Sequence, residues 1–170
     1  MCKKIFSKCV CCEVESACGY SLKEGVIFVG ITSLVISVVM LFTAITTLII
    51  ITCMKKQFNS NPIVAINLIF GLVAACLSTY QIIITLLLLW QAVKTKGNIF
   101  LCSLWFVSHI SLLTMYFLLF SAEAAVCIVK KRIITAAFTI FIGIIYEAIF
   151  IYYAIIVNSY LHSLNQARYL

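Results

Sequence analysis

The sequence predicts an all-α integral membrane protein, an antiparallel four-helix transmembrane bundle. Of its 170 residues, 65% are hydrophobic and 10% are charged, and the mean hydropathy is +1.20. A soluble domain is about half apolar and about a quarter charged. The apolar residues also gather into four long runs separated by short polar segments. A soluble globule of this size could not hide so much apolar surface from water, so lipid is the expected environment.

The four apolar runs cover residues 26–53, 63–92, 99–129 and 133–157. Each run exceeds the roughly 20 residues that a helix needs to cross the hydrocarbon core. Helices are expected because a helix satisfies its own backbone in lipid, whereas barrel strands would be shorter and alternating. A cysteine-rich polar tail, 1–25, precedes the first run, and a short polar stub, 158–170, follows the last.

The connections between the runs are short and carry turn residues, Asn59-Ser60-Asn61-Pro62 in one and Gly97-Asn98 in another. Short connections make neighbouring helices antiparallel, which predicts an up-and-down bundle. Small residues recur at helical spacing in the first two runs, and such residues let helices approach closely in lipid. They are Gly30, Ser33, Ser37, Ala44 and Thr47 in the first run, and Gly71, Ala74, Ala75 and Ser78 in the second.

The net charge of +7 is concentrated in clusters between the apolar runs, such as Lys55-Lys56 and Lys130-Lys131-Arg132. This pattern is typical of loops that anchor spans at phospholipid head groups. It argues against nucleic acid and makes the lipid bilayer, and other membrane proteins or a second copy, the expected partners. Charge alone does not orient the chain, because the two sides carry seven and five basic residues.

The N-terminal tail contains a group of cysteines that allows three interpretations. The first is S-acylation of a cytosolic juxtamembrane tail, with Cys9, Cys11, Cys12 and Cys18 as the candidates. The second is a zinc site, although only Cys9 and Cys12 have ligand spacing and no second pair follows. The third is a disulfide cluster, which requires the tail to face an oxidising compartment.

Two further cysteines, Cys53 and Cys127, end the first and third runs beside basic loops. An up-and-down bundle places both at the same side of the membrane, so a disulfide between them is conceivable if that side is extracytosolic. The simpler interpretation is that both are small apolar residues on helix surfaces.

Three ionisable residues fall inside the apolar runs, namely Glu147, His109 and Glu123. Such groups are costly in lipid and are candidates for function. Counting from a turn near residue 131 places Glu147 level with about residue 115 and His109 level with about residue 153. The offset is about six residues, or ~9 Å along the axis. One interpretation is that the pair is part of a proton or cation relay. The interpretation that we favour is that Glu147 is protonated, hydrogen-bonds to a neighbouring helix and fixes the bundle register.

No catalytic pattern occurs in the chain: HExxH, GxSxG and P-loop motifs are absent. The sequence therefore predicts no enzyme and no cofactor. The leading hypothesis is an organiser or accessory subunit that binds other membrane proteins or lipids. The alternative is a proton or cation transporter or channel subunit that uses Glu147 and His109.

Two stretches resemble a known family. The tail CCEVESACGYSLKEGVIFVGI combines clustered cysteines with a short polar segment, Gly25 and an aliphatic run, and the last span ends in Val157-Asn158-Ser159-Tyr160. Both are similar to small insect and nematode four-span proteins related to the lysosome-associated protein transmembrane family and to pasiflora-like junction proteins. The resemblance implies cytosolic termini, a plasma-membrane or endolysosomal location, and a role in membrane trafficking or cell-junction assembly. The chain lacks the proline-tyrosine motifs of the lysosomal members.

Overall fold

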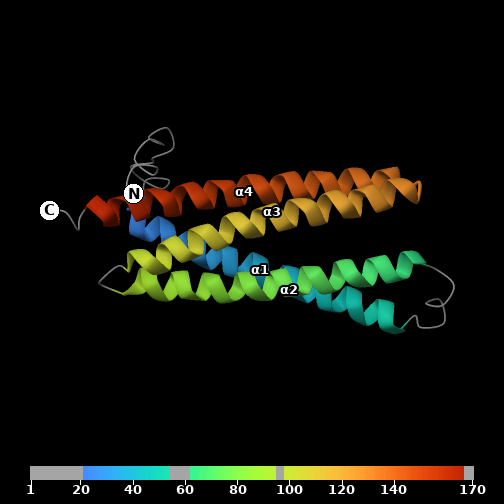
Figure 1. Cartoon of the computed structure of the whole chain (residues 1–170), viewed down its shortest axis with the longest axis horizontal. Coiled ribbons are helices and arrows are strands. Elements are labelled where there is room, and N and C mark those ends of the chain that lie inside the picture. The colour runs from blue at the N-terminus through green and yellow to red at the C-terminus, as the bar shows by residue number, and fades with distance from the viewer. Residues whose placement is uncertain (1–20, 54–61, 95–97, 167–170) are drawn as a thin grey trace, which may run out of the picture.

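The computed structural model describes residues 21–53, 62–94 and 98–166, which form four α-helices. These are α1 (Leu22–Cys53), α2 (Pro62–Val93), α3 (Ile99–Val129) and α4 (Ile133–Gln166). All four are long and apolar enough to cross a membrane. Successive helices run in opposite directions, so the start of α1 and the end of α4 lie at one end of the bundle (Figure 1). The predicted fold class, an α-helical four-helix bundle, is confirmed.

Helix α1 begins at Leu22, four residues before the apolar run, because the polar residues there form a cap. The Ser21 backbone N–H and hydroxyl donate to the Glu24 carboxylate at 3.0 and 2.8 Å, and the Glu24 N–H donates to the Ser21 hydroxyl at 3.3 Å. This reciprocal arrangement is a capping box, which satisfies backbone donors that a helix start leaves free. The helix can therefore begin in the polar stretch ahead of the apolar run.

Helix α4 continues to Gln166, nine residues beyond the end of the apolar run at 157. Ser159 and Tyr160 are buried, and Leu161 and Leu164 pack against the core. The apolar members of this segment lie three to four residues apart and so share one helix face. Most of the predicted C-terminal stub is thus a further part of α4 that packs on the bundle.

A tight turn joins α3 to α4 and holds them as an antiparallel pair. Lys131 has a φ of 58°, in the left-handed region. Its N–H donates to the Ile128 carbonyl at 2.8 Å, and the Arg132 N–H donates to the Cys127 carbonyl at 3.0 Å. These bonds form a Schellman motif, which closes the end of α3 and reverses the chain within three residues.

The helices pair as two hairpins, α1 with α2 and α3 with α4, and the hairpins make fewer contacts with each other. Gly30 of α1 lies against Leu89 of α2, and Gly71 of α2 lies against Leu48 of α1. In the second hairpin, Gly143 of α4 lies against Phe120 of α3. A glycine at each of these contacts lets a large side chain approach the opposite backbone, as is common between helices in lipid.

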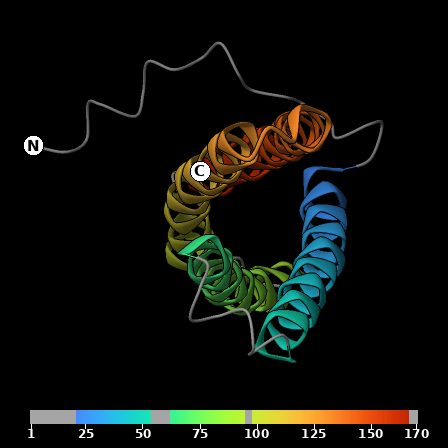
Figure 2. The same cartoon turned by 90° about the vertical axis from the view of Figure 1, so that its right-hand side faces the viewer.

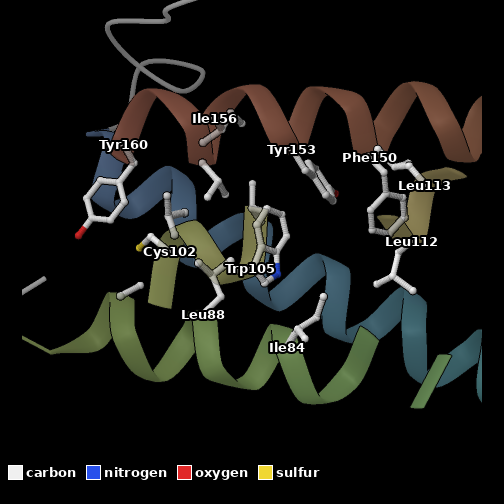
Figure 3. Close-up of a cluster of buried hydrophobic side chains, with 14 of the residues drawn as sticks. Ile84, Leu88, Cys102, Trp105, Leu112, Leu113, Phe150, Tyr153, Ile156 and Tyr160 are labelled. Atoms are coloured by element: carbon white, nitrogen blue, oxygen red, sulfur yellow. The ribbon is translucent and has the colours of Figure 1, made fainter. Parts of the chain in front are cut away.

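The core lies mainly in the half of the bundle that contains the start of α1 and the end of α4. Buried residues of α1 extend only as far as Ala44, whereas α4 is buried mostly from Tyr146 onward. Trp105 stands at the centre of this core, with Ile84 and Leu88 of α2 on one side and α4 on the other (Figure 3). Toward the opposite end the two hairpins separate (Figures 1 and 2).

Candidate functional site: polar residues within the membrane

His109 of α3 lies inside the bundle with only 1% of its surface exposed. Its ring stacks on that of Trp105 with centroids 4.3 Å apart, and the Phe150 ring lies 5.2 Å away. The Nε2 atom is 3.3 Å from the Phe150 carbonyl oxygen. Because a carbonyl only accepts, Nε2 carries the hydrogen, and in a neutral ring Nδ1 is an acceptor. His109 is thereby fixed between α3 and α4 by packing and one hydrogen bond.

Further polar side chains meet one another in the same interior. The Tyr146 hydroxyl donates to Gln81 Oε1 at 3.0 Å and so links α4 to α2. Ser78 and Tyr116 share a hydrogen bond of 3.1 Å between α2 and α3, and Ser33 and Thr85 share one of 3.3 Å between α1 and α2. These bonds connect all four helices. Interhelical hydrogen bonds of this kind stabilise membrane bundles by about 0.6 kcal/mol on average.

Glu147 of α4 has a different environment, since its side chain lines a groove of about 460 Å³ between α3 and α4. Phe117, Phe120 and Ser121 contribute from α3, and one face of α4 contributes from Ile140 to Ile151. Phe117, Ile144 and Ile151 are each more than half exposed, so the groove opens toward lipid. Glu147 Oε1 is buried, and no residue of the described segments forms a hydrogen bond with it.

The groove continues along the same helix pair toward the end of α4. A second hollow of about 220 Å³ lies between Phe106, Ile110 and Leu113 of α3 and the α4 residues from Ile151 to Asn158. Ile151 lines both hollows. The combined groove follows α4 from Ile140 to Asn158, which corresponds to ~27 Å at 1.5 Å per residue. Sequence reasoning did not single out Ser121 and Asn158, although both lie at helical spacing with groove residues of their own helix.

Glu147 and His109 lie at different levels of the α3–α4 pair. His109 reaches Phe150 of α4, whereas Glu147 faces the groove beside Phe120 and Ser121 of α3. The contact of His109 with Phe150 falls within a helical turn of the level predicted for it. Among the described residues no hydrogen bond connects the two side chains, so a direct relay between them has no structural support here.

Glu123, the third candidate, lies near the loop end of α3 and is exposed. Lys130 interacts with it electrostatically, and the Lys130 ammonium also donates to Asn67 Oδ1 of α2 at 3.4 Å. Glu123 therefore has a cation of its own chain nearby. Glu147, deeper in the span, has no such cation among the described residues.

The cysteine predictions stay open. Cys9, Cys11, Cys12 and Cys18 lie outside the described residues. Cys53 and Cys127 are both free thiols, Cys53 exposed at the end of α1 and Cys127 half-buried near the end of α3. Over residues 21–53, 62–94 and 98–166, no three His, Cys, Asp or Glu side chains come together as a metal site.

The fold and these polar groups define a multi-pass α-helical membrane protein. No protein-family model, no curated protein and no solved structure matches the chain. The resemblance to lysosome-associated and pasiflora-like four-span proteins therefore stays a prediction.

Proposed function

We propose that the protein is a non-enzymatic accessory or organiser subunit that binds another protein within the membrane through the α3–α4 groove. The observation that carries the proposal is the Glu147 carboxyl, which lines a lipid-facing groove and whose Oε1 has no hydrogen-bond partner within residues 21–53, 62–94 and 98–166. Carboxyl groups within a span usually face a partner or a water-filled cavity, because lipid tails offer no hydrogen bonds. A role in membrane trafficking or cell-junction assembly is the more specific form of the proposal, and it rests on the family resemblance.

Site-specific photo-crosslinking in intact cells tests this function. A benzophenone amino acid replaces Ile144, which is 63% exposed in the groove, or Phe42 of α1, which is 72% exposed on the opposite hairpin. We expect the groove position to give discrete protein adducts and the Phe42 position to give lipid adducts alone. Lipid adducts alone from both positions would contradict the proposal, as would the same protein adducts from both.

The alternative function, a proton or cation pathway through Glu147 and His109, receives less support from the geometry. His109 is enclosed by Trp105 and Phe150, while Glu147 faces the outer groove. Flux measurements in liposomes decide this point. A proton or cation flux that Glu147→Gln abolishes, in a variant that still folds, would favour transport over the accessory role.

A further inference from the structure

We propose that the α3–α4 groove binds a transmembrane helix of a different protein, one that carries a Lys or Arg near its middle to pair with Glu147. This inference rests on the proposed function and specifies the chemistry of the partner. Three observations lead to it: the depth of Glu147, the shape of the groove, and the positions of the basic residues in this chain.

The depth of Glu147 excludes a lipid head group as the missing partner. Glu147 lies two residues from the middle of the apolar run 133–157 and ten residues from its nearer end. Ten residues of helix correspond to ~15 Å, which is half of the ~30 Å hydrocarbon core. Head groups lie beyond that distance, and acyl chains carry no hydrogen-bond donor. A donor from outside this chain that pairs with the Glu147 carboxyl must therefore be held in mid-membrane, as a side chain on another helix is.

The shape of the groove suits a helix lying alongside α3 and α4. Its length of ~27 Å, from Ile140 to Asn158, nearly matches the thickness of the hydrocarbon core. One small exposed residue, Ala148, lines its α4 side. Small side chains allow close approach of a further helix.

A second copy of this chain cannot supply the cation. Its 12 Lys and Arg residues all lie in the tails, in the connections or at the ends of the spans, and none lies in mid-span. Several lipid-facing hydroxyls are also already bonded within their own helices. Thr43, Thr79 and Thr114 each donate to the carbonyl four residues earlier. A partner with a basic residue in mid-span therefore has to be a different protein.

Charge complementarity then selects the residue type on that partner. A Lys or Arg in the middle of a span is as costly alone as a carboxylate, and intramembrane charges characteristically pair with each other. Removing one member of such a pair leaves the other unpaired in a medium of low dielectric. The ion pair would therefore form only when the two helices associate. It would favour a partner helix with a central Lys or Arg over one without.

A defined peptide tests the inference. The full-length protein is placed in phosphatidylcholine vesicles with a labelled Leu–Ala helix of about 20 residues, long enough to cross the bilayer, that carries one central Lys. An otherwise identical helix with a central Leu is the reference, and energy transfer between the labels reports association. We expect the Lys helix to bind the wild-type protein about tenfold more tightly, which is at the upper end of what interhelical polar contacts contribute in membranes.

Two variants assign this preference to Glu147. Glu147→Gln is expected to remove the preference for the Lys helix, and Glu147→Asp to retain part of it. Glu123→Gln is the matched control, because that carboxyl already interacts with Lys130 of its own chain, and it is expected to keep the full preference. Equal binding of both helices to the wild-type protein would overturn the inference, and so would a preference that survives in Glu147→Gln or disappears in Glu123→Gln.

Self-association is measured in the same vesicles with two differently labelled copies of the protein. Energy transfer between copies that depends on Glu147 would show a carboxyl pair between two copies and would overturn the inference.

The crosslinking and peptide-binding results together separate this inference from the proposed function. If groove crosslinks to a protein persist in cells while the Lys helix shows no preference, the function stands and the partner chemistry is wrong. If groove crosslinks are absent too, both fail.

Discussion

Tyr146 and Glu147 are neighbours in the sequence of α4, yet they face two different regions of the molecule. Tyr146 points into the bundle, where its hydroxyl donates to Gln81 at 3.0 Å and its ring lies 4.3 Å from that of Phe150. Glu147 points into the groove between α3 and α4, where the described part of the chain provides no hydrogen bond to Oε1. The described fold thus provides a hydrogen bond for the hydroxyl of Tyr146 but none for Oε1 of the adjacent Glu147.

This difference separates two uses of polarity in the membrane. Interior polar groups link the helices of this chain, as Ser78 does with Tyr116 and Ser33 with Thr85. The groove carboxyl contributes nothing of this kind to the described fold. A group that is costly in lipid and unused by the described fold is a candidate for function, and the proposed function gives it a partner outside the chain. Substitutions on the two sides should therefore affect different properties, stability in the interior and association in the groove.

The largest expected effect is a reversal of specificity at the groove. Glu147→Lys should abolish binding of the central-Lys helix and create binding of a helix with a central Glu. Placing two like charges together in low dielectric costs several kcal/mol, and breaking a buried pair costs about 3–5 kcal/mol. Energy transfer in vesicles measures both helices against the same protein. Loss of the first preference without gain of the second would show that size or hydration, rather than charge, governs the groove.

On the interior side, Trp105→Ala should cost about 3 kcal/mol of unfolding free energy, as large-to-small core substitutions do. Trp105 is 1% exposed and supports the ring of His109 at 4.3 Å. Unfolding in mixed detergent micelles, followed by circular dichroism, provides the measurement. Phe117→Ala, at a groove residue that is 59% exposed, is the control and should cost much less. Equal losses would mean that the interior and the groove do not differ in packing.

Sequence reasoning predicted the helices better than it predicted the surroundings of their polar residues. Apolar runs longer than 20 residues leave few alternatives to spanning helices, and the register count placed His109 within a turn of its contact with Phe150. The helical extension beyond Val157 was not predicted, because Asn158, Ser159 and His162 look like a solvated stub. Nor did the sequence indicate which way Glu147 points, since Ile and Phe surround α4 on every side and leave no polar stripe.

Alanine substitutions of glycine compare how closely the helices pack in the α1–α2 hairpin and in the α3–α4 hairpin that forms the groove. A Cβ at Gly30 would lie 2.5 Å from Leu89 Cδ2 and 2.7 Å from Leu89 Cγ, so the α1–α2 contact has to shift. We expect Gly30→Ala to cost about 1–2 kcal/mol, as overpacked cores do. A Cβ at Gly143 would lie 3.2 Å from the nearest atom of Phe120, and the lower chain entropy of alanine offsets that crowding by about 0.5–1 kcal/mol.

Gly143→Ala should therefore change the unfolding free energy by less than about 1 kcal/mol. The same detergent unfolding measures both variants. A larger loss of unfolding free energy for Gly143→Ala than for Gly30→Ala would show that the α3–α4 hairpin, which forms the groove, is more tightly packed than the α1–α2 hairpin.

The smallest expected effects on stability concern two adjacent residues, Tyr146 and Glu147. Tyr146→Phe removes the donor to Gln81 Oε1, and Gln81 Nε2 already lacks a partner, so the buried amide loses its described hydrogen bond. Interhelical bonds in membrane proteins average about 0.6 kcal/mol, and that is the expected loss. Glu147→Gln should leave stability within about 0.5 kcal/mol while it removes binding of the central-Lys helix. If Glu147→Gln instead destabilises the bundle by more than Tyr146→Phe does, the carboxyl stabilises this chain itself, and the case for a partner that must supply its missing donor is lost.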